Sequence, residues 1–367
     1  MMERRHDGPL SAFFAVALCL GFALVALAGC GTTQTGGQPA VGLIETKQGT
    51  YESRILLYDA KLREVGSRSF DYASLGTNWN LSPVVADDLH VIPQGLGNQK
   101  NGKEALCIDL EDYSTTSYPI DRVNLYGVSG TPDYLYACSN LNGDSFITRV
   151  DKRSKETSEI CLEDTYVTSI MVYGERLYAF ASGSPLPGSA LDPDSSWLNV
   201  YDLDMNLISS VEITECGTGQ YRPAAWKDLV LFTSWTDPRQ TDGLPSRALG
   251  IYDVQADSLT VKEFDSAVLE ALPYGDCVLL LFGDIHASTP TSAALFDPEE
   301  SRLLDDPVDL GCSAHQRLIV DDDLYVLDSE RTLRRFAIDD GFEQSEETSV
   351  SSMDGDYSYI SGMFPAR

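Results

Sequence analysis

A short unit, made of an apolar run, an aspartate and a polar turn, recurs from one end of this sequence to the other. It is clearest in residues 197–211, where Trp197-Leu-Asn-Val-Tyr-Asp202 is followed by a polar turn and a second apolar run. The corresponding aspartates are Asp59, Asp109, Asp151, Asp202, Asp253, Asp297 and Asp339. Aspartate is favoured at the first position of a type I turn, because its side chain accepts hydrogen bonds from the backbone amides of the turn. Each unit therefore predicts a β-hairpin, and we interpret the aspartates as turn residues rather than catalytic groups.

The spacing of these units indicates the architecture. Successive aspartates lie 50, 42, 51, 51, 44 and 42 residues apart, which matches the period of four-stranded propeller blades. A second kind of hairpin, with Gly or Asp at its turn, lies between them at residues 84–92, 131–133, 170–180, 227–228, 274–276, 318–327 and 354–356. Seven hairpins of each kind, or about 28 strands, predict an all-β, seven-bladed β-propeller of four-stranded antiparallel blades over residues 51–367.

The order of the hairpins also predicts how the ring closes. The chain opens with an outer hairpin near residues 55–59 and finishes with an inner hairpin near residues 357–360. We expect these two to pair, so that strands from both termini complete one blade and leave only short edges. The apolar-apolar-Tyr-Asp pattern resembles bacterial propellers with a Tyr-Val-Thr-Asn or quinoprotein-like repeat. That resemblance implies a fold and no particular activity.

The first residues have the layout of a secretory signal peptide. Arg4 and Arg5 precede an apolar run over residues 10–26. This run of 17 residues is near the lower limit for crossing a bilayer. A plain signal peptide and an uncleaved anchor helix are therefore both compatible with the run itself.

The residues after the apolar run suggest a lipid anchor. Leu27-Ala-Gly-Cys30 resembles the lipobox of bacterial lipoproteins, and the Gly- and Thr-rich residues 31–37 resemble the tether that follows it. The resemblance implies that residues 1–29 are removed and that residues 30–50 form a flexible tether. It also implies that Cys30 carries a diacylglycerol and a further acyl chain such as palmitate. Because two or more acyl chains anchor stably, we expect a protein lipid-anchored to a cell membrane on its extracytoplasmic side.

Export would permit disulfides. Six cysteines remain after Cys19 and Cys30 are set aside: Cys107, Cys138, Cys161, Cys216, Cys277 and Cys312. Their spacing selects no pairing, and several lie in apolar strands where a buried free thiol is equally compatible. No Cys-x-x-Cys pair is present, which disfavours zinc and thiol-redox sites.

The net charge of the chain limits the classes of partner that it is expected to bind. With 26 basic and 56 acidic residues, the formal net charge is −30. Phosphate backbones are bound by basic stripes, and the sequence contains none, so we expect no nucleic-acid partner. The acidic residues are spread through turns, which is typical of a solvated surface.

Ligand-binding residues are expected on the long connections of the propeller. The connections between second and third strands are long at residues 94–104, 182–196, 235–246 and 283–291. The connections that lead into the next blade share this face, and together they give a candidate ligand-binding rim of Trp79, Tyr126, Tyr166, Tyr221, Arg222, Trp235, His286 and His315. Such aromatic and polar groups suit stacking and hydrogen bonding with a polar ligand. Packing over the blade tops is the alternative interpretation.

The sequence carries no clear catalytic or metal motif. Beyond the predicted signal peptide there are three histidines, His90, His286 and His315, so a three-histidine metal site would need all of them. Asp284-Ile-His286 places two possible ligands two residues apart, which is a weak signal. No Gly-x-Ser-x-Gly elbow is present. We therefore assign no catalytic residue and expect no metal or cofactor.

These observations favour a membrane-anchored binding or scaffold module for a protein, peptide or glycan. The alternative is a cell-envelope hydrolase or lyase with its acid and base on the same rim. Its candidate residues are His286, His315, Asp237 and Arg222. A third hypothesis, that the protein is a redox enzyme with a quinone cofactor, rests on fold analogy alone.

Overall fold

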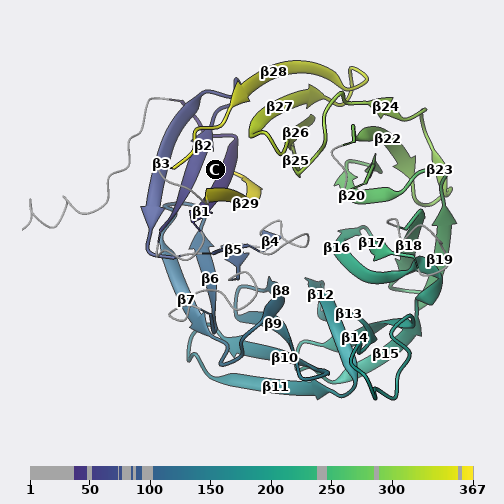
Figure 1. The fold of residues 1–367 in the computed structure, drawn as a ribbon. Coiled ribbons are helices and arrows are strands. Elements are labelled where there is room, and N and C mark those ends of the chain that lie inside the picture. Colours follow the sequence, from purple (N-terminus) through teal and green to yellow (C-terminus); the bar gives the residue numbers. More distant parts are fainter. Residues whose placement is uncertain are drawn as a thin grey trace, which may run out of the picture.

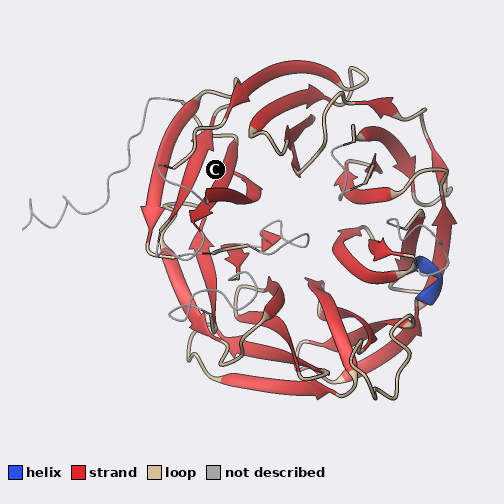
Figure 2. Cartoon of the chain, viewed as in Figure 1, coloured by secondary structure: helices blue, strands red, loops and turns tan. Residues whose placement is uncertain are grey.

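The chain folds into a ring of seven antiparallel sheets, which confirms the predicted seven-bladed β-propeller (Figure 1). The computed structural model describes residues 37–47, 52–72, 74–76, 84–85, 88–92, 102–237, 246–284, 289–353 and 358–366. Strands make up nearly all of its regular structure, and the helical content of the described residues is the short 3-10 turn η1 (Thr214–Cys216) (Figure 2). No helix in these ranges is long and apolar enough to cross a membrane.

Six blades are continuous in sequence, and their strands run from the axis of the ring to its outer wall. Blade 2 contains β4 (Val84–Val85), β5 (Asp88–Val91), β6 (Glu104–Asp109) and β7 (Thr115–Pro119). Blade 3 contains β8 (Leu125–Gly130), β9 (Tyr134–Leu141), β10 (Asp144–Asp151) and β11 (Thr157–Leu162). Blade 4 contains β12 (Thr165–Tyr173), β13 (Arg176–Gly183), β14 (Ser196–Asp202) and β15 (Leu207–Glu212).

Blade 5 contains β16 (Thr218–Trp226), β17 (Leu229–Thr236), β18 (Ala248–Asp253) and β19 (Ser258–Glu263). Blade 6 contains β20 (Val268–Tyr274), β21 (Cys277–Phe282), β22 (Ser292–Asp297), β23 (Arg302–Leu303) and β24 (Val308–Asp309). Blade 7 contains β25 (Gln316–Val320), β26 (Asp323–Leu327), β27 (Thr332–Ala337) and β28 (Glu343–Ser349). In blade 6 the outermost strand is broken, because β23 and β24 both pair with β22. The remaining blades follow the four-strand pattern.

Blade 1 closes the ring with strands from both ends of the chain, as predicted, but the two ends divide these strands differently from the expectation. It consists of β29 (Ser358–Pro365) from the C-terminal end, followed outward by β1 (Val41–Lys47), β2 (Ser53–Tyr58) and β3 (Glu64–Phe70). One strand and three strands therefore meet, rather than two hairpins. The expected inner turn at residues 354–356 lies outside the described residues.

Strand β1 also corrects the expected domain boundary. It lies within residues 30–50, which the sequence analysis interprets as a tether, yet it pairs with β29 from Val41↔Pro365 to Lys47↔Ser358 and with β2 on its other edge. Its residues are almost all buried. The propeller therefore includes Val41 and does not begin at residue 51.

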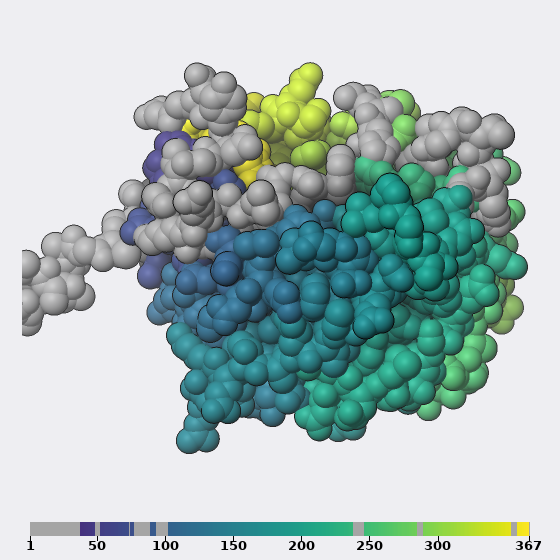
Figure 3. Space-filling model, turned by 60° about the horizontal axis from the view of Figure 1, so that its bottom comes forward, coloured from purple at the N-terminus to yellow at the C-terminus, as the bar shows by residue number. Residues whose placement is uncertain are grey.

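Apolar side chains fill each interface between neighbouring blades. The described core divides into seven clusters, one for each of the seven blade interfaces. On one side of blade 1, Leu43 packs with Tyr325 of blade 7, and on the other side Ile44 packs with Leu106 of blade 2. In the tilted view of Figure 3, the described residues of neighbouring blades on the near side of the ring lie directly against one another. Burial is therefore spread around the ring, and every blade depends on both neighbours.

The recurrent aspartates act as turn residues in six of the seven outer hairpins. Asp59 Oδ1 accepts hydrogen bonds from the amides of Lys61 and Arg63, both at 3.0 Å. Equivalent contacts are made by Asp109, Asp151, Asp202, Asp253 and Asp297. Asp339 differs, because its Oδ1 accepts the Tyr274 hydroxyl at 2.8 Å.

Each outer hairpin also contains a non-glycine residue in the left-handed region. These residues are Leu62, Tyr113, Lys155, Met205, Asp257, Ser301 and Phe342, with φ between 49° and 63°. A left-handed residue after a type I turn restores the strand register in longer hairpin loops. Four of the side chains, Leu62, Tyr113, Met205 and Phe342, are buried. Their packing offsets the strain of this backbone conformation.

None of the six cysteines beyond Cys30 forms a disulfide with another described cysteine. They are Cys107, Cys138, Cys216 and Cys312, which are buried, Cys277, which is half-buried, and Cys161, which is exposed. Burial raises the pKa of the Cys138 thiol to about 12. Of the two alternatives left by the sequence, the structure therefore has buried thiols and no disulfide among these residues.

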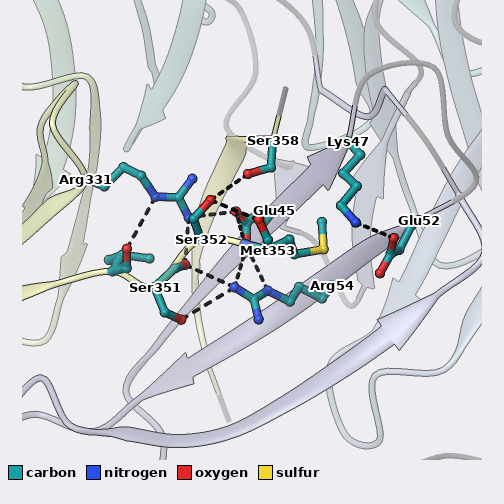
Figure 4. Close-up of polar contacts among 10 residues, drawn as sticks. Glu45, Lys47, Glu52, Arg54, Arg331, Ser351, Ser352, Met353 and Ser358 are labelled. Atoms are coloured by element: carbon teal, nitrogen blue, oxygen red, sulfur yellow. Dashed lines mark hydrogen bonds and ion pairs between the residues drawn. The ribbon is translucent and has the colours of Figure 1, made fainter. Parts of the chain in front are cut away.

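A buried carboxylate joins the two ends of the chain to blade 7 (Figure 4). Glu45 on β1 is fully buried and accepts hydrogen bonds from Arg54 Nε and Arg331 Nη2, each at 2.7 Å, and from the Met353 amide at 3.1 Å. Arg54 and Arg331 also donate to the carbonyl oxygen of Ser351, at 3.0 and 2.8 Å. The Glu45 network, defined as these five residues, thus links β1 and β2 to blade 7 and to the segment that leads into β29.

The pKa of Glu45 reflects this network. Burial alone would raise it, but the Met353 amide, the Ser358 side chain and the two arginines hold it below its ordinary value of 4.5. A carboxyl group whose pKa is lower in the folded state stabilises the fold above its unfolded pKa, and this contribution is lost as the pH falls through the folded pKa.

We expect Glu45→Gln to lower the free energy of unfolding by about 2–3 kcal/mol at neutral pH. This is less than for a fully enclosed pair, because the side chains of Arg54 and Arg331 are 20% and 23% exposed. Denaturant unfolding measures this loss. The control is Glu347→Gln, which removes an exposed partner of Arg334 and should change the free energy of unfolding by under about 0.5 kcal/mol. The difference between wild type and Glu45→Gln should be constant above about pH 5 and shrink below it. Equal losses in the two variants would contradict a role for Glu45 in closure.

Candidate functional site

The two faces of the ring carry different connections. The turn face carries the short outer hairpin turns described above. The loop face is defined by the connections between second and third strands and by those leading into the next blade, and among its described residues are 120–124, 142–143, 184–195, 213–217, 264–267, 310–315 and 328–331. The innermost strands β29, β4, β8, β12, β16, β20 and β25 surround the axis between the two faces (Figure 1).

Five of the innermost strands contain a bulge. The pairing register shifts in β8 at Tyr126, in β12 at Thr168, in β16 at Arg222 and Pro223, in β20 at Leu269 and in β29 at Ser361. A bulge inserts an unpaired residue and redirects a side chain, and bulges are frequent beside functional sites. At Arg222 the backbone is also in the left-handed region, with φ 46°. Such strain in a residue other than glycine is concentrated at functional sites.

Three charged side chains from successive innermost strands meet close to this bulge. Glu270 Oε2 on β20 accepts hydrogen bonds from Arg222 Nη1 on β16, at 2.9 Å, and from Arg317 Nε on β25. The side chains of Arg222, Glu270 and Arg317 are 5%, 6% and 0% exposed. We call these three residues the central arginine cluster. Two guanidinium groups thus share one carboxylate oxygen in a buried setting, where breaking the pairing is strongly destabilising.

Arg317 uses part of its donor capacity. Besides Nε, its Nη1 donates to the carbonyl oxygen of Ala314 at 3.0 Å, and the His315 carbonyl lies at 3.5 Å. Its Nη2 is buried and has no hydrogen-bond partner among the described residues. Burial, followed by the nearby charge of Arg222, lowers the pKa of Arg317 to about 10. The guanidinium therefore stays charged at neutral pH with a donor unsatisfied.

His315 lies beside the cluster at the loop-face end of β25. Its side chain is exposed to solvent, yet burial by the surrounding protein lowers its pKa, with Arg222 and Arg317 adding to the effect and Asp328 opposing it. Two arginines thus act on an accessible histidine in a chain whose net charge is −30.

The predicted aromatic residues form two separate pairs. Tyr126 on β8 and Tyr166 on β12 pack edge to face with ring centroids 5.1 Å apart, and both are half-buried. Burial and a hydrogen bond with Tyr126 raise the pKa of Tyr166. Trp235 on β17 is half-buried and packs against Tyr221 at 6.0 Å. Tyr221 itself is 1% exposed, so it supports the rim from inside and is not part of the ligand-accessible surface.

The other predicted site residues are not brought together in the described ranges. Trp79 and His286 lie outside the described residues. Asp237 is described and buried, and His90 is buried in β5. The described residues contain no group of three or more His, Cys, Asp or Glu side chains that could hold a metal ion. Nor does the imidazole of His315 form a hydrogen bond with any described residue that could act as a nucleophile.

Two hollows among the described residues lie on opposite faces of the ring. On the loop face, a mainly apolar pocket of about 140 Å³ lies beside Tyr166 and is lined by Leu141, Gly143, Pro185 and Leu186. Leu141 and Leu186 are 39% and 49% exposed. On the turn face, a polar groove of about 430 Å³ lies between blades 5 and 6. The loop-face pocket places apolar surface next to one of the predicted rim residues.

Glu270 and Arg317 were not predicted from the sequence. Arg222, Glu270 and Arg317 are separated by 48 and 47 residues, about one blade period, so they occupy similar positions in three successive blades. This spacing of charged residues within apolar strands is a usable signal. Pro223 is another, because proline cannot donate to a strand ladder and marks a bulge inside a sheet.

Comparison with solved structures supports the fold. The chain is similar to apo AztD from Citrobacter koseri, with a TM-score of 0.52, 10% identity and coverage of 90% of this chain and 99% of that chain. It is also similar to Kuenenia stuttgartiensis hydrazine synthase, with a TM-score of 0.51, 12% identity and coverage of 79% and 95%. For the dihydro-heme d1 dehydrogenase NirN, the TM-score is 0.50 with 9% identity and coverage of 89% and 77%.

At this level of identity the comparisons show a shared propeller fold and nothing about ligand or reaction. No family model matches the sequence, and no curated protein sequence matches it.

We expect Glu270→Gln to lower the free energy of unfolding by about 3–5 kcal/mol, because it leaves two buried guanidinium groups without their shared carboxylate. Denaturant unfolding provides the measurement. The matched control is Glu299→Gln, which removes an exposed partner of Lys227 and should change stability by under about 0.5 kcal/mol. A Glu270→Gln protein as stable as wild type would show that the cluster does not hold blades 5, 6 and 7 together.

Proposed function

We propose that this protein is a membrane-anchored, extracytoplasmic propeller that binds a protein, peptide or glycan on its loop face without converting it. The observation that carries the proposal is the set of accessible aromatic and polar side chains that separate blades contribute to this face. They are Tyr126 from blade 3, Tyr166 from blade 4, Trp235 from blade 5 and His315 from blade 7.

The chemistry of these groups suits a binding surface. Tyrosine and tryptophan offer large rigid contact areas together with a polar atom, and they are enriched at interfaces. The apolar pocket beside Tyr166 could receive one side chain or sugar face, and His315 offers a polar edge above a buried charge. A rigid ring holds these groups in fixed relative positions, which reduces the entropy lost on binding.

The anchor is proposed from the sequence. Leu27-Ala-Gly-Cys30 resembles a lipobox, and the residues between Cys30 and β1 would link the lipid to the ring. An anchored propeller with a tether of this kind would present its loop face to partners at or near the membrane surface.

The hydrolase or lyase alternative draws on one observation. Burial, followed by the nearby charges of Arg222 and Arg317, lowers the pKa of His315, which favours the neutral imidazole that a general base needs. A catalytic function would further need a nucleophile or a bound water within hydrogen-bonding distance of that imidazole.

We expect the double variant Tyr126→Ala, Trp235→Ala to reduce partner binding at least tenfold, since aromatic anchors dominate the binding energy of interfaces. In-cell crosslinking followed by identification of the captured molecule, and then a binding titration, measures the effect. Tyr173→Ala is the matched control, because Tyr173 is 39% exposed at an inner turn on the turn face. Equal capture by the double variant and wild type would place the binding surface elsewhere.

We expect Cys30→Ala to abolish membrane attachment, because the thiol that carries the lipid is lost. Fractionation of cells, with detection of the lipid-modified mass in the wild type, provides the measurement. Cys161→Ala, which changes an exposed cysteine on β11, should leave attachment intact. Retention of Cys30→Ala in the membrane with normal processing would argue against lipid attachment at this residue.

A further inference from the structure

We propose that the central arginine cluster, with His315 at its exposed edge, binds a carboxylate group of the ligand held on the loop face. This inference rests on the proposed binding function and names the chemistry at its centre. The carboxylate would accept hydrogen bonds from Arg317 Nη2 and lie against the imidazole of His315.

The first support is the unsatisfied donor. Arg317 is the largest fully buried side chain described, and its side chain is 0% exposed. Its Nε and Nη1 have acceptors in Glu270 and Ala314, whereas Nη2 has none among the described residues. A buried charged donor without an acceptor carries a full desolvation penalty. An acceptor supplied by a ligand would remove that penalty.

The second support is the way the cluster is built. Arg222 is held at a bulge, next to a proline and with φ 46°. This strained conformation directs its guanidinium across to Glu270 on the next blade. Glu270 thereby orients both arginines through a single carboxylate oxygen, while Arg317 Nη2 is left without an acceptor among the described residues. Strain and pairing together keep a charged donor fixed before the ligand arrives, which is how binding sites are preorganised.

The third support is access from the loop face. His315 is exposed and is only two residues from Arg317, whose Nη1 approaches the His315 carbonyl at 3.5 Å. Of the charged groups that act on this imidazole, Arg222 and Arg317 disfavour its protonated form and Asp328 favours it. Asp328 is itself paired with Arg334 at 2.6 Å. A ligand that reaches His315 therefore comes close to two arginines, while the nearby carboxylate is already paired.

The shape and charge of the site favour a carboxylate over a phosphate. A planar carboxylate matches the edge of a guanidinium group. Glu270 remains within the cluster as a buried anion, and a second anion beside it is repelled in proportion to its charge. A monoanionic carboxylate therefore fits better than a dianionic phosphate. A peptide C-terminus, an acidic side chain and an acidic sugar all carry this group.

The test is an NMR pH titration of the His315 imidazole in the full-length chain, with sodium acetate as the probe and sodium chloride at equal ionic strength as the reference. His315→Asn assigns the signal. An anion beside the ring stabilises the imidazolium, so acetate should raise the pKa of His315 by about one unit, and by linkage acetate should bind roughly tenfold more tightly to the protonated form. The Arg317 Nε–H signal should move with it. An acetate series that leaves both signals unchanged would overturn the proposal.

Variants then test the specific donor. Arg317→Lys keeps the charge but removes the fork, so acetate affinity should fall at least tenfold. Arg149→Lys is the matched control, because Arg149 pairs with Asp204 outside the cluster and its replacement should leave the acetate response intact. An acetate response that survives Arg317→Lys would also overturn the assignment. Because the joint movement of the His315 and Arg317 signals is measured in wild-type protein, the test does not depend on the folding of the variant.

Further probes separate the sources of the carboxylate and the two levels of the account. N-acetylglycine and glucuronate represent peptide and sugar carboxylates, and the stronger response identifies the source. A larger response to inorganic phosphate than to acetate would refute the carboxylate assignment. Partner capture that depends on Tyr126 and Trp235 but is accompanied by no acetate response would leave the binding function standing and remove the carboxylate site. An acetate response without such capture would leave the carboxylate site standing and remove the proposed binding of a partner through Tyr126 and Trp235.

Discussion

The antiparallel pairing of β29 with β1 is the interaction on which the ring depends. A blade on its own leaves apolar surface on both faces, and in a propeller this surface is covered only when each blade has two neighbours. Blade 1 receives its innermost strand from the C-terminal end and its three outer strands from the N-terminal end. Its interfaces with blades 7 and 2 are therefore completed only when β29 is in place, because Met363 and Phe364 of this strand belong to the two core clusters.

The Glu45 network reinforces the same junction by a different means. Hydrophobic contact is nondirectional, whereas the Glu45 carboxylate accepts from two arginines and one amide in a fixed geometry. Each donor comes from a part of the chain that must be in place before the ring is closed. The network thus makes closure specific as well as favourable. It is also the part of the junction that responds to pH, because it needs an ionised carboxyl group.

The candidate site depends on the closed ring because its residues come from different blades. Arg222, Glu270 and Arg317 belong to blades 5, 6 and 7, and their contacts set the spacing of three innermost strands. The protein is strongly acidic, with a formal net charge of −30, yet Arg222 and Arg317 both act on the accessible His315. Separation of this kind favours selection of an anionic group at one place while the remaining surface repels anions.

Much of the fold could be predicted from the sequence, since the hairpin aspartates repeat at the blade period and their turn geometry is local. The boundary at β1 could not, because the inner hairpin of blade 1 is split between the two ends and so carries no turn signal before Val41. The candidate site was harder to predict from the sequence than the fold. Tyr221 and Trp235 are both aromatic residues near the loop face, but burial separates them, with Tyr221 1% exposed, and burial depends on how the strand bulges. The contact of Arg317 with Glu270, across 47 residues, follows from the ring and from no local pattern.

Hydrogen exchange of the backbone amides in β1 and β29, compared with those in β13 on the opposite part of the ring, tests closure most directly. If the two ends form an integral blade, the central amides of β1 and β29 exchange only through global unfolding and share the rate of β13. The account predicts that agreement. Exchange of β1 and β29 orders of magnitude faster than β13, with β13 still protected, would show that the ring stands without this pairing and would contradict the central claim.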